Sequence, residues 1–167
     1  MYNQAPIRRD KNLMLLSREH HTGLLTVWKI RQGLRLNIST ERIADFIING
    51  FECEEEPHFC EEEQLLFPLL PEQLDLRLNA EADHAAIRKI VAVLHQTARI
   101  SVEDIEAFAN LLEAHIRFEE RILFPYIEKE VAPDVLDKIG YKLSVDHEHK
   151  VSFEWEDAFW LKPKQTI

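Results

Sequence analysis

HFCEEEQLLFP at residues 58–68 and HIRFEERILFP at residues 115–125 are two versions of one pattern. In both, a glutamate follows the histidine by four positions, giving the pairs His58–Glu62 and His115–Glu119, and Phe-Pro begins nine positions after the histidine. On an α-helix, residues four apart lie one turn apart on the same face. Each pair can therefore aim an imidazole and a carboxylate at one point, and two such pairs on facing helices could hold two metal ions.

The repeat also has a matching opening, because Glu19-His20 and Asp83-His84 precede the two copies. The chain therefore reads His…His-x-x-x-Glu twice. A single helical His-x-x-x-Glu usually means a surface pair worth only about 0.2–0.5 kcal/mol. Two copies in register favour a metal site, and if a helix starts after Asn79, Glu62 and His84 lie equally far from their shared turn.

This doubled pattern resembles the hemerythrin-like (HHE cation-binding) family of non-haem di-iron four-helix bundles, over roughly residues 13–130. Ferritin-like bundles use Glu with Glu-x-x-His and are rich in carboxylates, whereas imidazole dominates here. The resemblance implies two iron ions joined by an oxo or hydroxo group, with both repeat glutamates bridging them. The expected metal ligands are His20, His58, Glu62, His84, His115 and Glu119.

These ligands and the bridge leave two open positions on two six-coordinate irons. Oxygen-carrying members of the family have a fifth histidine four residues beyond the one in helix three, where this chain has Arg88. Simple oxygen storage is therefore disfavoured. The resemblance implies binding or sensing of a diatomic molecule such as oxygen or nitric oxide, or of iron itself, and mixed imidazole and carboxylate donors suit iron.

Two other classes of function stay open at this stage. One is a di-iron oxidase or peroxidase that acts at the open positions. The other is an interaction bundle whose metal is structural, with zinc or manganese as alternatives to iron. The pattern favours a metal-binding or diatomic-ligand-binding protein over an enzyme.

Composition predicts one all-α domain. The 167 residues are 46% hydrophobic and 30% charged and include only four glycines, with long Leu-, Ala- and Glu-rich stretches rather than alternating β-branched ones. We expect an up-down-up-down four-helix bundle over residues 1–133. Residues 134–167 should form a short C-terminal helical extension packed on the same domain.

Local signals predict the helix boundaries. Helix one should run from about Asn12 to Leu34, and helix two from after Thr40 to Phe67. Proline inside a helix removes a backbone donor and clashes with the carbonyl four residues earlier, so Pro57 predicts a kink just before His58. The remaining expected helices run from after Asn79 to near Ala98, from the Ser101 cap with Asp104 to before Pro133, and from Pro133 to a stop at Gly140.

The formal net charge of −10 disfavours nucleic acid and anionic membrane surfaces as partners, because both need a basic face. No stretch reaches the roughly 18 apolar residues of a membrane span. The N-terminal residues also lack the apolar core of a signal peptide. We therefore expect a cytoplasmic protein.

The remaining candidate residues have simpler interpretations. His21 and His95 are expected outside the site, and His147 and His149 in a solvated polar turn. Cys53 and Cys60, seven apart, are too distant along a helix for a disulfide and should be small buried hydrophobic residues. Neighbouring residues on an α-helix are turned by about 100° from each other, so glutamates next to the expected ligands should be mostly solvated. There are three of them, and the first is the best substitute ligand: Glu61, Glu63 and Glu120. The tail aromatics either pack on the bundle or anchor a homodimer: Phe153, Trp155, Phe159 and Trp160.

Overall fold

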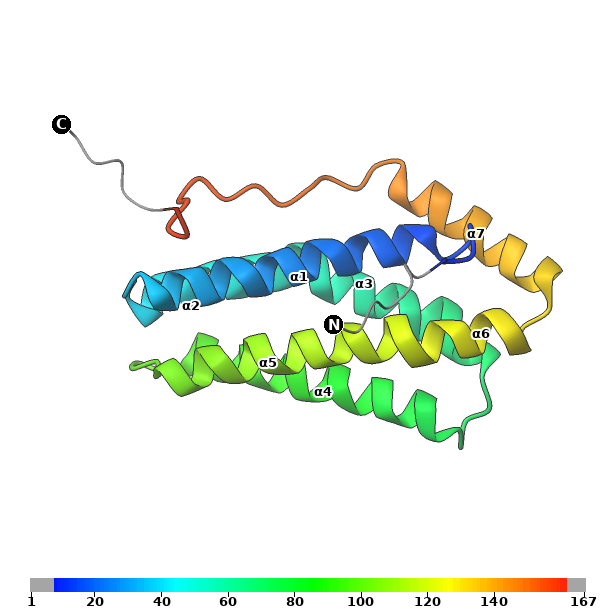
Figure 1. The fold of residues 1–167 in the computed structure, drawn as a ribbon, viewed down its shortest axis with the longest axis horizontal. Helices are drawn as coiled ribbons and strands as arrows, with labels where there is room; N and C mark the ends of the chain where they lie inside the picture. The colour runs from blue at the N-terminus through cyan, green and yellow to red at the C-terminus, as the bar shows by residue number, and fades with distance from the viewer. Residues whose placement is uncertain (1–7, 162–167) are drawn as a thin grey trace, which may run out of the picture.

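The computed structural model describes residues 8–161, and no strand occurs among them. Residues 1–7, on which the expectation of no signal segment rests, lie outside this range. Four helical rods run side by side, as predicted, and the first and third are unbroken helices, α1 (Met14–Arg35) and α4 (Asp75–Gln96) (Figure 1). The second rod joins α2 (Thr40–Gly50), η1 (Phe51–Glu55), α3 (Glu56–Glu61), η2 (Glu62–Leu66) and η3 (Phe67–Leu69). The fourth joins α5 (Val102–Phe118), η4 (Glu119–Leu123) and α6 (Phe124–Glu130), and α7 (Pro133–His147) follows.

The segments η1, η2 and η4 are π-helical, and each lies directly ahead of a proline. Pro57, Pro68 and Pro125 each have their fourth preceding residue inside such a segment. The wider π turn accommodates the proline ring and its missing N–H, which an α-helical turn would not. Helix two is therefore distorted just ahead of His58, where the kink is predicted. The repeat glutamates, Glu62 and Glu119, are the first residues of η2 and η4.

Two helix ends follow from local chemistry. Ser101 and Asp104 form the predicted capping box at the start of α5, with the Asp104 N–H donating to Ser101 Oγ at 3.1 Å. At the end of α1, Asn37 has φ of 53° and donates its N–H to the Leu34 carbonyl, while the Ile38 N–H donates to the Gly33 carbonyl. This Schellman arrangement stops the helix, because asparagine tolerates the left-handed region.

The start of α4 differs from the prediction. The helix begins at Asp75, four residues before the expected cap at Asn79, which lies inside it. The turn is closed earlier by the Leu74 N–H, which donates to the Pro71 carbonyl at 3.0 Å. Leu74 and Leu76 also pack against the adjoining core, so burial favours a helix that starts sooner.

The extension α7 is longer than predicted, because Gly140 lies within the helix and does not stop it. A Cβ at Gly140 would come within 2.2 Å of Asn12 Oδ1. This glycine therefore serves close approach between α7 and the segment before α1. Leu136 and Leu143 are buried there, so α7 packs on the end of the bundle (Figure 1).

The apolar core is divided into two parts by a polar layer. One cluster, towards the α1–α2 turn, includes Ile30, Phe46 and Phe108, and the other, towards α7, includes Leu16 and Phe124. At the level of the polar layer α1 lies close to α5, where a Cβ on Gly23 would be 2.7 Å from Ile116 Cδ1. The metal-ligand candidates occupy the layer between the two clusters.

The chain after α7 runs back along the bundle toward the α1–α2 turn (Figure 1). The tail aromatics gather around Phe46, with ring centroids 5.3–5.9 Å from it: Phe153, Trp155, Phe159 and Trp160. Packing on the bundle therefore accounts for these side chains. Within residues 8–161, no helix combines the length and the apolar character needed to cross a bilayer.

Candidate metal centre

The structure brings all six predicted ligand residues into one buried layer at the middle of the bundle. α1 supplies His20, α3 supplies His58, α4 supplies His84 and α5 supplies His115. None of these histidines is more than 5% exposed, and the two glutamates are fully buried. Their donor atoms form two groups, each suited to one ion, and both glutamates belong to both groups: His20, His58, Glu62 and Glu119; and Glu62, His84, His115 and Glu119.

In the first group, the Nε2 atoms of His20 and His58 lie 2.9 Å apart. Glu119 Oε2 lies 3.0 Å from His20 Nε2, and Glu62 Oε1 lies 3.3 Å from His58 Nε2. Two nitrogens bound to one ion at about 2.1 Å and at a right angle would be about 3.0 Å apart. The spacing of these donors therefore fits adjacent positions around a single ion.

The second group repeats this geometry. The Nε2 atoms of His84 and His115 are 3.1 Å apart, and Glu62 Oε2 lies 3.3 Å from His84 Nε2. Glu119 Oε2 lies 3.3 Å from His115 Nε2, and its Oε1 is 3.9 Å from His84 Nε2. Glu62 thus presents one oxygen to each histidine pair, and Glu119 touches both pairs. Each carboxylate is placed to bridge two ions.

All four carboxylate oxygens of Glu62 and Glu119 are buried without a hydrogen-bond partner in the described part of the chain. Burying an unpartnered carboxylate is costly, and buried charges in proteins are normally paired or coordinate metals. Four such oxygens among four imidazole nitrogens form a donor set that two cations would satisfy. The residues present therefore fit a dinuclear metal centre.

Each histidine also faces a carboxylate on its outer side. The Nδ1 atoms of three of them lie 2.7–2.8 Å from a glutamate oxygen: His20 with Glu120, His58 with Glu19, and His84 with Glu63. The His115 Nδ1 is 3.4 Å from Asp83 Oδ2, beyond a good hydrogen bond for this pair. A carboxylate at Nδ1 fixes the ring so that Nε2 faces inward, and it makes the imidazole a better metal ligand.

This outer layer corrects the prediction that Glu63 and Glu120 are mostly solvated. Their side chains are only 32% and 15% exposed, and each holds a histidine of a neighbouring helix. Both side chains do turn away from the centre, as their positions on their own helix predict, but the neighbouring helix was not considered in that prediction. A residue turned by about 100° from a ligand faces the next helix of the bundle. Glu19, the acid of the first acid-His opening, acts on His58 in the same way, whereas Asp83 of the second opening faces His115 at the longer distance of 3.4 Å.

Arginines support two of these outer glutamates. Arg88, which stands where oxygen carriers have a fifth histidine, donates to Glu63 at 2.7 Å and to Glu56 at 2.8 Å. Arg9 donates to Glu120 Oε2 at 2.7 Å. Arg88 therefore acts on His84 through Glu63 and is not a ligand itself.

Phenylalanines of the repeat close the centre on its α7 side. Phe67 and Phe124, the phenylalanines of the two Phe-Pro pairs, stack on His84 and His20 with ring centroids 5.5 and 5.1 Å apart. Phe59 stacks on the other face of His84 at 3.8 Å. His84 is thereby enclosed and has no exposed surface.

Electrostatics in the metal-free layer favour charged pairs. Burial alone would raise the pKa of Glu62, but the positive charge of His58 and the closeness of the His58 and His84 rings, each 3.3 Å away, hold it well below its usual value. Burial would lower the pKa of His58, yet Glu62 and Glu19 raise it well above 6.5. The pKa of His20 and that of His84 are also raised, against burial, by neighbouring glutamates. These shifts favour protonated imidazoles in the metal-free layer, where protons compete with metal ions for the same nitrogen atoms.

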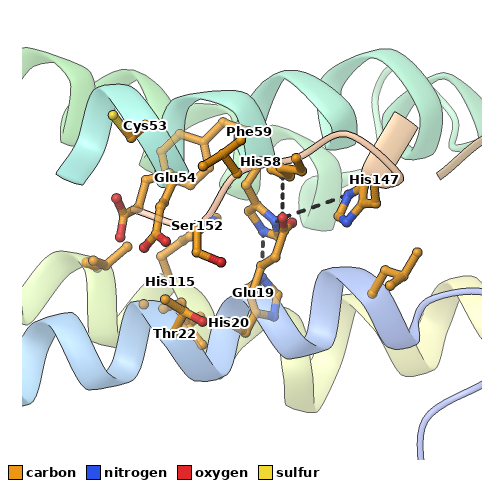
Figure 2. A pocket seen from close by; sticks show the side chains of 17 residues that line it. Glu19, His20, Thr22, Cys53, Glu54, His58, Phe59, His115, His147 and Ser152 are labelled. Atoms are coloured by element: carbon orange, nitrogen blue, oxygen red, sulfur yellow. Dashed lines mark hydrogen bonds and ion pairs between the residues drawn. The ribbon is translucent and has the colours of Figure 1, made fainter. Parts of the chain in front are cut away.

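A cavity of about 290 Å³ opens beside the centre between α1 and the α2–α3 rod (Figure 2). Three of the four histidines line it: His20, His58 and His115. The C-terminal segment covers one side of the cavity with Lys150, Val151 and Ser152. A small molecule in this space would lie against the first histidine pair.

His147 differs from its prediction, because it lies at this cavity rather than in a solvated turn. Its side chain is 12% exposed, and Nε2 lies 2.9 Å from Glu61 Oε2. Glu19 points from α1 toward both His58 and His147 (Figure 2). Lys150 forms ion pairs with Glu19 and Glu61, so Glu61 is neither solvated nor placed in the metal layer. The extra length of α7 carries these residues over α3.

The remaining histidines and the cysteines lie outside the layer. His21, His95 and His149 are exposed, as expected of residues outside the site. Both cysteines are free thiols, but Cys53 is exposed and Cys60 only partly buried, so the prediction of buried cysteines is wrong. Cys53 lines the cavity beside the centre, and neither cysteine belongs to the metal layer.

A family model described as the hemerythrin HHE cation binding domain matches residues 16–127. The matched range contains all six residues of the metal layer. The chain has no significant match among curated proteins or among solved structures.

Proposed function

We propose that this chain, which belongs to the hemerythrin HHE cation-binding domain family, holds two iron ions joined by an oxo or hydroxo group. Through these ions it would bind or sense oxygen, nitric oxide or iron itself. Metal binding in general is supported by the family match and by the buried histidine and glutamate clusters. The choice of iron is supported by the mixed imidazole and carboxylate donors.

One observation carries the proposal: four unpartnered carboxylate oxygens lie between two pairs of inward-facing imidazole nitrogens. A purely structural core would not retain this arrangement, because apolar residues of similar volume would avoid its desolvation cost. A lone structural zinc prefers four donors in one tetrahedral set, whereas here two sets share both carboxylates. Two ions with shared ligands fit better.

Bound iron would supply positions at which a small ligand can exchange, together with one-electron chemistry. The chain's own residues hold and orient the ions. Glu19, Glu63 and Glu120 fix the ring orientation of three histidines. Phe59 and Phe67 exclude water from the His84 side, whereas the cavity leaves the His20 and His58 side open. A diatomic ligand would therefore enter through the cavity.

The test is metal analysis of protein purified from iron-replete cells, with optical spectra before and after dithionite. We expect about two iron ions per chain and a near-ultraviolet band that reduction removes, because oxo-bridged ferric iron absorbs there and zinc does not. Zinc or manganese at the same stoichiometry would replace iron in the proposal. A metal content near zero with iron supplied would refute it.

A second candidate function is a di-iron oxidase or peroxidase. The observation that favours it is the size of the cavity, about 290 Å³, compared with the ~30 Å³ that one water molecule occupies in the liquid. Consumption of hydrogen peroxide by the iron-loaded protein with an added electron donor would distinguish turnover from simple binding. Binding without turnover would favour the first proposal.

Two further expectations are part of the proposal. A cytoplasmic location is consistent with two free thiols, which stay reduced in that compartment. A homodimer through the C-terminal aromatics stays a prediction, and size-exclusion chromatography with light scattering would test it.

A further inference from the structure

Glu55 is a buried carboxyl group that the metal layer does not use. It lies in η1 and is 6% exposed, and its Oε2 has no hydrogen-bond partner among residues 8–161. It belongs to none of the clusters in the described residues that could hold a metal ion. Burying a polar atom without a partner costs stability, so its presence needs another explanation.

The surroundings of Glu55 point to a ligand. Glu55 lines the cavity together with His20, His58 and His115, so its carboxyl group and three metal-layer histidines share one cavity. The cavity walls also include apolar groups such as Leu112 and Ile116. The unpartnered oxygen is therefore available to whatever occupies the cavity.

The internal repeat shows that packing does not require a carboxyl group at this position. Glu55 precedes His58 by three residues, and the equivalent residue before His115 is Leu112. Leu112 is 1% exposed and lines the same cavity. A leucine therefore fills the equivalent position in the other half of the bundle, and only one half has a carboxyl group there.

The charge environment determines which form Glu55 takes. Burial and the nearby charge of Glu54 raise the pKa of Glu55 to about 8, against the opposing effect of His58. Glu19 on α1 acts in the same direction as Glu54. In the metal-free protein at neutral pH, this shift favours the carboxylic acid form of Glu55, which can donate a hydrogen bond.

We propose that Glu55 donates a hydrogen bond to a small ligand held in the cavity beside the metal centre. The ligand class is a diatomic or triatomic molecule whose outer atom accepts a hydrogen bond while its other end lies toward His20 and His58. This inference rests on the proposed function, because it assumes metal in the layer. It assigns Glu55 a positioning role that the ligand residues do not supply.

The experiment uses azide as the probe and iron-loaded full-length protein, with the dissociation constant measured by optical titration at pH 7. Glu55→Leu copies the other half of the repeat and removes the donor, so it should weaken azide binding by about tenfold or more. Glu55→Gln keeps an N–H donor and should stay within about threefold of the parent protein. Glu52→Leu, at an exposed position of the same segment, should match the parent.

A second readout needs no metal. The melting temperature of metal-free Glu55→Leu should be higher than that of the parent by about 2–4 °C, because an unpartnered buried oxygen is removed. A lower melting temperature would show that Glu55 has a structural partner and would overturn the inference. Azide binding to Glu55→Leu that equals or exceeds the parent's would also overturn it. A parent protein that takes up no iron in metal analysis overturns the proposed function and this inference together. If the parent protein binds iron and azide, the Glu55 variants test this inference separately from the proposed function.

Discussion

The two halves of the bundle, α1 through η3 and α4 through α6, have matching inner layers and different surroundings. Each half supplies two histidines and one glutamate that is shared by both groups, and the two Nε2–Nε2 distances differ by only 0.2 Å. The cavity, Glu55 and the C-terminal segment lie beside the first pair, and the cavity also reaches His115 of the second pair. Around His84 are Phe59 and Phe67, and its surface is fully buried.

This difference separates two requirements. Under the proposed function, coordination of two ions through shared carboxylates would constrain both halves alike, which accounts for the repeat of the inner residues. Access for a ligand needs only one open side, so the residues beyond the ligands are free to differ. The first histidine pair is therefore where we expect ligand exchange, and the second is where we expect the metal to be most protected.

The largest effect on both halves should come from removing one of the two glutamates that they share. Glu62→Ala and Glu119→Ala should each reduce the metal content from about two ions per chain to near zero, because each carboxylate contacts both histidine pairs. Glu61→Ala, one position before a bridge, should keep both ions. Retention of one ion in either bridge variant would mean that the two halves bind metal independently.

Acid should weaken the centre next most strongly. In the metal-free protein the raised pKa values of His20, His58 and His84 contribute stability that is present below about 6.5 and is lost as pH rises through the folded pKa. The metal-bound protein needs these imidazoles neutral, so its dependence has the opposite sign. The gain in melting temperature on metal loading should therefore shrink from pH 8 to pH 5. Melting curves of both forms across this range test it, and a gain that grows in acid would contradict it.

The outer carboxylates offer a finer comparison between the halves. Glu120 lies 2.7 Å from His20 Nδ1, whereas Asp83 lies 3.4 Å from His115 Nδ1. Loss of such a partner typically costs about 10–100-fold in metal affinity. We expect Glu120→Gln to fall in that range and Asp83→Asn to cost less, as measured by competition with a chelator. Equal losses would show that the longer contact shortens when metal binds.

The smallest effect should come from the C-terminal segment. Lys150 pairs with Glu19, the carboxylate behind His58, but both side chains are 23% exposed. Such partly exposed pairs contribute about 1 kcal/mol or less, so Lys150→Ala should lower the melting temperature by only about 2–4 °C at most. Lys142→Ala, which breaks an ion pair within α7, is the matched control. A larger loss of metal affinity in Lys150→Ala than in this control would show that the segment supports the first histidine pair specifically.

The clustering of the inner layer could be predicted from the sequence, because His58, Glu62, His115 and Glu119 are related by spacings that depend only on helix geometry. Their role as metal ligands stays a prediction. Glu62 and His84 were expected at the same level because they lie equally far from their shared turn, and their side chains do meet. The helix start assumed in that comparison is wrong, since α4 begins at Asp75 and not after Asn79. Asparagine favours a cap, but leucine burial decided the boundary here. A local propensity could not anticipate that tertiary contact.

Features that depend on a neighbouring helix were harder to predict. Glu63 and Glu120 turn away from their own ligands, yet whether they meet solvent or a histidine depends on the helix beside them. His147 could not be placed while α7 was expected to end at Gly140. Gly140 itself is explained only by the approach of Asn12, which lies far away in the sequence.

The π turns that begin at Glu62 and Glu119 also change how the repeat must be counted along the chain. In an ordinary α-helix, a residue five positions after the glutamate would be rotated by about 140° away from it. A π turn advances by roughly 80° per residue, which brings the fifth residue back to within about 40°. Phe67 and Phe124 can therefore stack on histidines at the level of the carboxylates that precede them. The unit that builds this layer is thus the whole ten-residue segment from the histidine to the phenylalanine. Deletion of a single residue between the glutamate and the phenylalanine would turn the aromatic ring away while leaving His-x-x-x-Glu intact.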